Sequence, residues 1–139
     1  MLTREYKFLL VDDDPEDVML FNEAIYSISP LIKITTLING EALMQHLHAH
    51  TDNLPDILFL DLNMPFKNGV DCLKEIKTNE QLKNLMVIIY TTFLLPETFV
   101  SLHEEGASLV FIKSPIFVHL KNSLKNIVDI MIKSLPNNN

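Results

Sequence analysis

Short runs of apolar residues alternate along the chain with longer segments in which apolar residues recur at helical spacing. The runs have the length of buried strands, so the alternation predicts five strand–helix repeats. The predicted strands are Phe8–Asp12, Ile32–Leu37, Ile57–Leu60, Met86–Tyr90 and Leu109–Ile112, and the predicted helices are Glu16–Ser27, Gly40–Ala49, Val70–Thr78, Glu97–Glu105 and Phe117–Ser134. Such repeats favour a parallel sheet covered by helices on both faces. With right-handed crossovers and one reversal of strand order, the expected fold is α/β, a flavodoxin-like (βα)5 doubly wound five-stranded parallel sheet of order 2-1-3-4-5.

Local signals mark the ends of several elements. Asp14 and Pro15 predict an N-cap followed by proline at the first helical position. Gly106 is placed as a left-handed helix stop. The chain has 139 residues and no internal repeat, so a single domain over residues 1–139 is expected, with its core at about 5–134. The polar sequence Pro136–Asn139 is expected to be a frayed end, with no output domain in this chain.

Composition and charge narrow the functional classes. The formal net charge is −7, from 11 basic and 18 acidic residues, which argues against non-specific nucleic-acid binding and is compatible with binding a divalent cation. Cys72 is the single cysteine, so no internal disulfide can form and a cytoplasmic location is expected. Its amphipathic surroundings predict a small core residue. The charged N-terminus does not resemble a signal peptide, and no apolar run is long enough to predict membrane insertion.

Polar residues stand where the predicted strands end. Asp12 and Asp13 follow the first strand, Asp61 the third, Thr91 the fourth and Lys113 the fifth. Because the first and third strands are neighbours in the expected order, the three carboxylates should converge at one edge of the sheet. Clustered carboxylates repel one another unless a cation neutralises them, and hard oxygen ligands suit Mg²⁺. A carboxylate held in this way can attack a phosphoryl group, with Lys113 as the cation and Thr91 as the donor for its oxygens.

The spacing of these motifs resembles that of a response-regulator receiver domain, of the stand-alone kind typified by chemotaxis regulators. The matching segments are Leu9–Asp17, Asn39–Leu43, Asp61–Gly69, Ile89–Thr92 and Gly106–Lys113. The resemblance implies that Asp61 is the phosphoacceptor and that Thr91 and Lys113 contact the phosphoryl group. It also implies that Asp12, Asp13, Asp61 and the backbone carbonyl of Asn63 bind Mg²⁺, for which Mn²⁺ can substitute.

The same resemblance implies the partners. The phosphoryl donor is expected to be a sensor histidine kinase or a phosphotransfer protein, and the output an unidentified downstream protein. That partner would bind at the face formed by the fourth helix, the fifth strand and the fifth helix, and the chain would be a monomer or a weak dimer through this face. A receiver domain catalyses only its own phosphorylation and dephosphorylation, so the chain is not expected to be an enzyme acting on an external metabolite.

Three positions depart from the family pattern. Val110 stands where an aromatic switch residue is usual, and Phe111 should face the other side of the strand. Ser114 separates Lys113 from Pro115, which would move any cis peptide bond to Ser114–Pro115 and alter the reach of the lysine. Phe93 is a bulky residue at a position that influences access of hydrolytic water, which predicts slow dephosphorylation.

Other polar residues have structural interpretations. Asp14, Glu16 and Asp17 are interpreted as acids of a first helical turn. His46, His48 and His50 alternate along the sequence, and His46 and His50 would share a helix face. No acid or thiol is fixed beside these histidines, so a solvated helix end is favoured over a metal site.

Three alternative functions make different demands on the sequence. A haloacid-dehalogenase-type phosphotransferase carries its nucleophile in an Asp-x-Asp motif after the first strand, whereas position 63 is Asn and the candidate nucleophile follows the third strand. A nucleotide-binding flavodoxin-like module should offer a glycine-rich or hydroxyl-rich first turn, whereas this turn is acidic. A receiver fold that acts as an adaptor independently of phosphorylation is the main alternative, because of Val110 and Ser114.

Overall fold

All ten predicted elements are present in the computed structural model, which describes residues 2–136. The strands are β1 (Tyr6–Val11), β2 (Ile32–Leu37), β3 (Ile57–Leu60), β4 (Met86–Thr91) and β5 (Leu109–Ile112), and the helices are α1 (Pro15–Ile28), α2 (Gly40–Ala49), α3 (Gly69–Thr78), α4 (Pro96–Glu104) and α5 (Phe117–Ser134). The differences from prediction are shifts of one or two residues at element ends. The polar end predicted beyond Pro136 lies outside the described residues. Among the described residues, no helix combines the length and the apolar character that crossing a bilayer requires.

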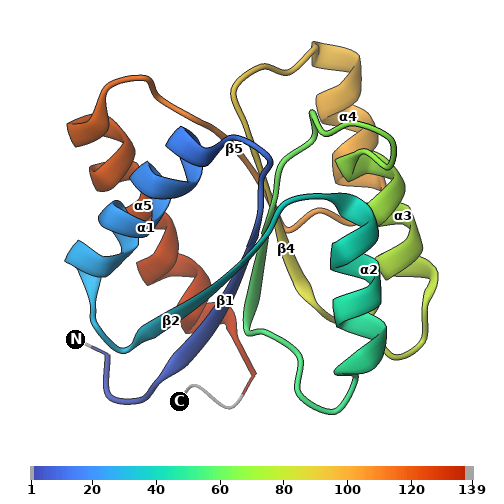
Figure 1. Cartoon of the computed structure of the whole chain (residues 1–139), viewed down its shortest axis with the longest axis horizontal. Coiled ribbons are helices and arrows are strands. Elements are labelled where there is room, and N and C mark those ends of the chain that lie inside the picture. Colours follow the sequence, from blue (N-terminus) through green and yellow to red (C-terminus); the bar gives the residue numbers. More distant parts are fainter. Residues whose placement is uncertain (1, 137–139) are drawn as a thin grey trace.

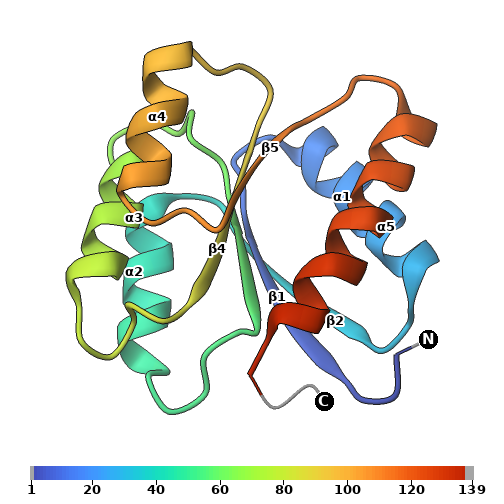
Figure 2. The same ribbon diagram turned by 180° about the vertical axis from the view of Figure 1, so that it is seen from behind.

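The five strands form one parallel sheet in the order β2-β1-β3-β4-β5, as the sequence predicts. Helices α1 and α5 cover one face of the sheet, and α2, α3 and α4 cover the other (Figures 1 and 2). Strand β3 is buried at all four positions because its neighbours on both sides are strands and both of its faces are covered. This explains why its sequence is continuously apolar rather than alternating.

The sheet divides the core into two clusters of different composition. The aromatic cluster lies between the sheet and α1 and α5, and its rings belong to Tyr6, Phe8, Phe21, Phe59, Tyr90 and Phe111. The aliphatic cluster lies between the sheet and α2, α3 and α4, and its buried members are Leu, Val, Ile, Met, Ala and Cys residues. Alternation along β1 produces this division, because Phe8 faces the first cluster and Leu9 the second.

Two local devices fix chain segments near the carboxyl edge of the sheet. The side chain of Asp14 accepts hydrogen bonds from the backbone N–H groups of Glu16 and Asp17, which caps α1 as predicted. Gly69 begins α3 so close to the end of β3 that a Cβ atom there would lie 2.5 Å from the carbonyl oxygen of Asp61. Helix α3 therefore begins directly against the backbone of Asp61. At the opposite edge, Gly106 has a φ of 99° and ends α4, as its sequence context predicts.

Candidate functional site

Three carboxylates meet where β1 and β3 end. The backbone N–H of Asp61 donates to the carbonyl oxygen of Val11 at 3.0 Å, which places the residues following both strands side by side. One oxygen atom from each of Asp12, Asp13 and Asp61 lies within 4.8 Å of the others. Asp12 is fully buried and Asp61 is 6% exposed, whereas Asp13 is exposed to solvent. The predicted convergence of these three acids is what the structure shows.

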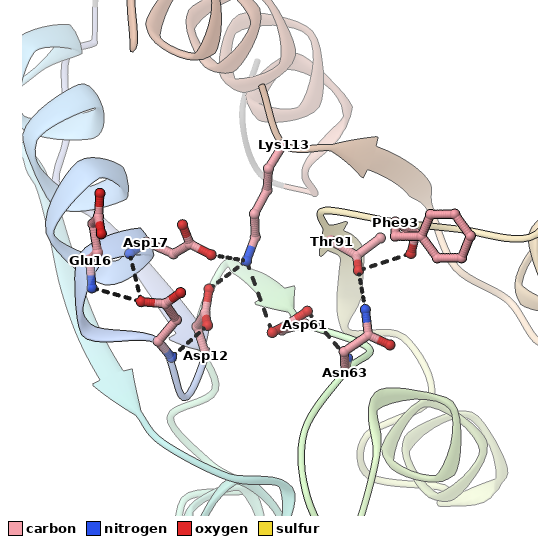
Figure 3. Close-up of polar contacts among 9 residues, drawn as sticks. Asp12, Glu16, Asp17, Asp61, Asn63, Thr91, Phe93 and Lys113 are labelled. Atoms are coloured by element: carbon pink, nitrogen blue, oxygen red, sulfur yellow. Dashed lines mark hydrogen bonds and ion pairs between the residues drawn. The ribbon is translucent and has the colours of Figure 1, made fainter. Parts of the chain in front are cut away.

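Lys113 lies against the acidic cluster from the end of β5 (Figure 3). Its Nζ is 2.7 Å from Oδ2 of Asp12, 3.1 Å from Oδ2 of Asp17 and 3.9 Å from Oδ2 of Asp61. Burial lowers the pKa of Lys113, but its hydrogen bond to Asp12 and the charges of Asp61 and Asp12 outweigh burial and leave the pKa above its ordinary value. The lysine therefore carries a full positive charge at neutral pH. Its ammonium also lies 4.8 Å from the centre of the Tyr90 ring.

Asp61 is a nearly buried carboxylate with two other carboxylates beside it. Its pKa is raised from 3.8 to about 6. Burial is the main cause and the charge of Asp12 adds to it, whereas the ammonium of Lys113 acts on the pKa in the opposite direction. Together, Asp12, Asp13, Asp17 and Asp61 outnumber the single ammonium of Lys113. Oxygen ligands at this spacing, with an excess of negative charge, fit a hard divalent cation such as Mg²⁺ or Mn²⁺.

A chain of hydrogen bonds links Asp61 to the loop that follows β4. The backbone N–H of Asn63 donates to Oδ1 of Asp61 at 3.3 Å, and its side-chain Nδ2 donates to the Thr91 hydroxyl at 3.1 Å. The Thr91 hydroxyl in turn donates to the carbonyl oxygen of Phe93 at 3.4 Å. Thr91 is fully buried. Among the described residues its hydroxyl makes no direct hydrogen bond to Asp61, and Asn63 links the two side chains (Figure 3).

The departures from the family pattern have clear structural outcomes. Val110 packs against the aliphatic cluster, whereas Phe111 is buried on the other face with its ring 5.3 Å from that of Tyr90. The predicted alternation is thus confirmed, and Phe111 does not replace an aromatic residue at position 110. No cis peptide bond occurs in residues 2–136, and Lys113 reaches Asp12 although Ser114 follows it.

Sequence reasoning missed two members of the site and one ion pair. Asp17 lies in the first turn of α1 as expected, but the interpretation as a helix-end acid is incomplete, because its carboxylate pairs with Lys113. Tyr90 lies beneath the same ammonium. No local sequence pattern marks either contact. A lysine at a strand end can reach acids on several neighbouring segments, and the sequence does not show which of them it pairs with. The statement that no acid lies beside the histidines is wrong, because Nε2 of His48 is 3.1 Å from Oε2 of Glu75.

Cys72 has the structural role that its surroundings predict. The side chain is fully buried in the aliphatic cluster. Burial raises the pKa of its thiol from 9.0 to about 11, which keeps it protonated and unreactive at neutral pH.

A parallel sheet with an acidic cluster and a lysine at its carboxyl edge is typical of one class of signalling domain. The chain matches the response regulator receiver domain over residues 8–125 and belongs to that family. It is 29% identical over 111 residues to stress response regulator protein 1 of Debaryomyces hansenii, which covers 80% of this chain and 45% of the relative. The chain therefore spans less than half the length of that relative.

Two solved structures are similar over nearly the whole chain. The phosphorylated cyanobacterial phytochrome response regulator RcpA has a TM-score of 0.87 and 27% identity, with 96% of this chain and 99% of that chain covered. The Mn²⁺-bound form of the response regulator Rcp1, known from Synechocystis sp., has a TM-score of 0.79 and 28% identity, with 88% and 91% covered. The receiver fold predicted from the sequence is thereby confirmed.

Proposed function

We propose that Asp61 accepts a phosphoryl group from the phosphohistidine of a sensor histidine kinase or a phosphotransfer protein. The proposal rests on the placement of one nearly buried carboxylate beside the Asp12–Asp13 pair, with the ammonium of Lys113 3.9 Å from one of its oxygens. In the transfer, a bond forms between an oxygen of Asp61 and phosphorus while the phosphorus–nitrogen bond of phosphohistidine breaks, and the released imidazole nitrogen takes up a proton. The chain would catalyse this step and the later hydrolysis, but turn over no external metabolite.

The reaction is proposed to require Mg²⁺, with Mn²⁺ as a substitute. The carboxylates of Asp12, Asp13 and Asp61 and the backbone carbonyl of Asn63 would hold the ion. When bound, the ion neutralises part of the negative charge on the phosphoryl group. The acidic cluster supports this assignment because burial and the neighbouring Asp12 already raise the pKa of Asp61, and a cation would relieve that repulsion.

Lys113 and Thr91 are proposed to bind the oxygens of the transferred group. Lys113 can exchange one of its carboxylate partners for a phosphoryl oxygen with a small movement, because its Nζ is already 3.9 Å from Asp61. The Thr91 hydroxyl must give up its hydrogen bond to the Phe93 carbonyl before it can donate to a phosphoryl oxygen. This exchange would link phosphorylation to the position of the loop between β4 and α4.

The output is proposed to be a change in binding at the face formed by α4, β5 and α5. Apolar side chains are half exposed there: Phe99 and Val100 on α4, Ile112 on β5 and Val118 on α5. Such a group of exposed apolar residues is suited to a protein partner or to a second copy of the chain in a weak dimer. Because position 110 is valine, any signal to this face would pass through Thr91 and the loop after β4, without a rotating aromatic residue.

An adaptor role independent of phosphorylation is the second candidate, and Val110 is the observation that favours it. A downstream protein that binds equally well to the wild-type chain and to Asp61→Asn would support the adaptor. A protein that binds only the phosphorylated wild-type chain would support the switch.

The first experiment is to incubate the chain with Mg²⁺ and acetyl phosphate and to measure the intact mass. A single phosphoryl adduct is expected, and it should be absent from Asp61→Asn and from a sample with EDTA. Asp14→Asn is the matched control, because Asn retains the cap of α1 and the acid of Asp14 has no assigned role in transfer. An adduct that persists in Asp61→Asn would refute the assignment of the phosphoacceptor.

A further inference from the structure

The loop between β3 and α3 exposes the aromatic side chain of Phe66 from a backbone conformation that is uncommon for a bulky residue. Phe66 has a φ of 66° and is the one residue other than glycine with a positive φ in the described chain. Its side chain is 101% exposed, more than any other large apolar residue of that part of the chain. A bulky residue in the left-handed region strains the backbone, and an exposed phenyl ring contributes nothing to the core. Strain of this kind persists only where the surrounding structure enforces it, and it points to a function.

The loop that carries Phe66 is firmly held. The backbone N–H groups of Met64 and Gly69 both donate to the carbonyl oxygen of Leu62 at 3.1 Å, so the loop closes on itself. Met64 is buried in the aliphatic cluster, and the Lys67 ammonium is paired with the carboxylate of Glu75 on α3. Phe66 therefore lies in a loop that is held on one side by the buried Met64 and on the other by the ion pair of Lys67 with Glu75. Its exposure does not depend on a mobile loop.

The loop that carries Phe66 follows Asp61 directly and lies at the carboxyl edge of the sheet (Figure 1). Phe66 follows the candidate phosphoacceptor by five residues, which limits their Cα separation to at most about 18 Å. The loop leaves Asp61 on the side of Asn63, opposite Asp12 and α1 (Figure 3). On the α1 side this edge is acidic, with exposed Asp13 and Glu16. The carboxyl edge of the sheet thus carries an exposed apolar ring in the loop after β3 and exposed negative charge at the start of α1.

We infer that Phe66 is a contact and specificity residue for the phosphohistidine-bearing protein that delivers the phosphoryl group. This inference rests on the proposed function. A small donor such as acetyl phosphate reaches Asp61 without covering the carboxyl edge of the sheet, whereas a protein donor must lie across it. The fitting partner carries an apolar surface that receives Phe66 and basic side chains that face Asp13 and Glu16, with its phosphohistidine between them.

The test compares a protein donor with a small donor. The protein donor is the histidine-phosphorylated phosphotransfer domain or kinase from the same organism that transfers fastest to the wild-type chain, and the small donor is acetyl phosphate. Phe66→Asn removes the ring and suits the left-handed backbone, because asparagine enters that region more readily than most residues. Phe66→Tyr keeps the ring. Ile130→Ala, at a site on α5 that is 62% exposed, is the control for losing an exposed apolar side chain.

We expect kcat/KM with the protein donor to fall about tenfold or more in Phe66→Asn, as for a buried interface aromatic residue. It should be retained in Phe66→Tyr and Ile130→Ala. The rate with acetyl phosphate should be unchanged in all three variants, and the melting temperature of Phe66→Asn should not fall, since the strain is relieved.

Three results would overturn the inference or its basis, and they are distinguishable. If Phe66→Asn accepts phosphate from the protein donor at the wild-type rate, Phe66 has no role in donor recognition, although the phosphoacceptor proposal stands. If Phe66→Asn loses transfer from both donors equally, the residue acts on the site itself and the docking role is refuted. If the wild-type chain is labelled by neither donor at Asp61, the proposed function fails and the role of Phe66 falls with it.

Discussion

Replacing Asp61 with asparagine should stabilise the fold at neutral pH when no divalent cation is bound. Burial is the largest cause that raises the pKa of Asp61 from 3.8 to about 6. Above that pH the folded chain holds a carboxylate that is better solvated in the unfolded chain. The two pKa values differ by about 2.2, and at about 1.4 kcal/mol for each pH unit the charged Asp61 costs at most about 3 kcal/mol of folding free energy.

The pH dependence of this effect follows from the direction of the shift. Below pH 3.8 the carboxyl group is protonated in both states and contributes nothing. Between 3.8 and about 6 the unfolded chain has released the proton that the folded chain still holds, so stability falls as the pH rises. The advantage of Asp61→Asn over the wild-type chain should therefore be small near pH 4, grow through this window, and level off above about pH 7.

Urea unfolding followed by far-UV circular dichroism, in EDTA and across this pH range, measures the effect. Asp129→Asn, an exposed carboxylate on α5, controls for the loss of one acid. Mg²⁺ should narrow the difference, because it would bind the wild-type cluster and stabilise only that chain. If Asp61→Asn is no more stable than the wild-type chain at pH 7.5 in EDTA, attraction to Lys113 outweighs burial and the reasoning is refuted.

Three further predictions concern single positions. Gly69→Ala should lower stability by about 3 kcal/mol in urea unfolding, because its Cβ would lie 2.5 Å from the Asp61 carbonyl oxygen, and a wild-type midpoint would show that the backbone yields. Asp14→Ala should cost about 1 kcal/mol in the same assay through loss of the α1 cap, whereas equal losses in Asp14→Asn would point to charge instead. Phe93→Ala should shorten the lifetime of the aspartyl phosphate, measured by decay of the phosphorylated mass, and an unchanged lifetime would remove Phe93 as a barrier to water.

The architecture could be predicted because its signals are local. Apolar runs such as Ile57–Leu60 are buried on both faces, and the helix caps at Asp14 and Gly106 depend on neighbouring residues. The predicted start of α4 at Glu97 is one residue late because Pro96 belongs to the first turn of that helix.

The site could be predicted only in part, because pairings across space leave little trace in the sequence. The convergence of Asp12, Asp13 and Asp61 followed from strand order alone. The choice of Asp17 as a partner of Lys113 depends on the direction of a side chain in the first turn of α1. The hydrogen bond from Asn63 to Thr91 joins residues 28 positions apart, and no local pattern marks it.

The aromatic cluster also determines which movements of the molecule can be seen by its own fluorescence. The sequence has no tryptophan and three tyrosines. Tyr6 and Tyr90 are buried in the aromatic cluster, and Tyr26 is exposed on α1. Intrinsic tyrosine fluorescence therefore reports on the layer containing α1 and α5. Rearrangements confined to α2, α3 and α4 would change its intensity very little. A kinetic experiment on the loop after β4 needs a fluorophore introduced on that second layer.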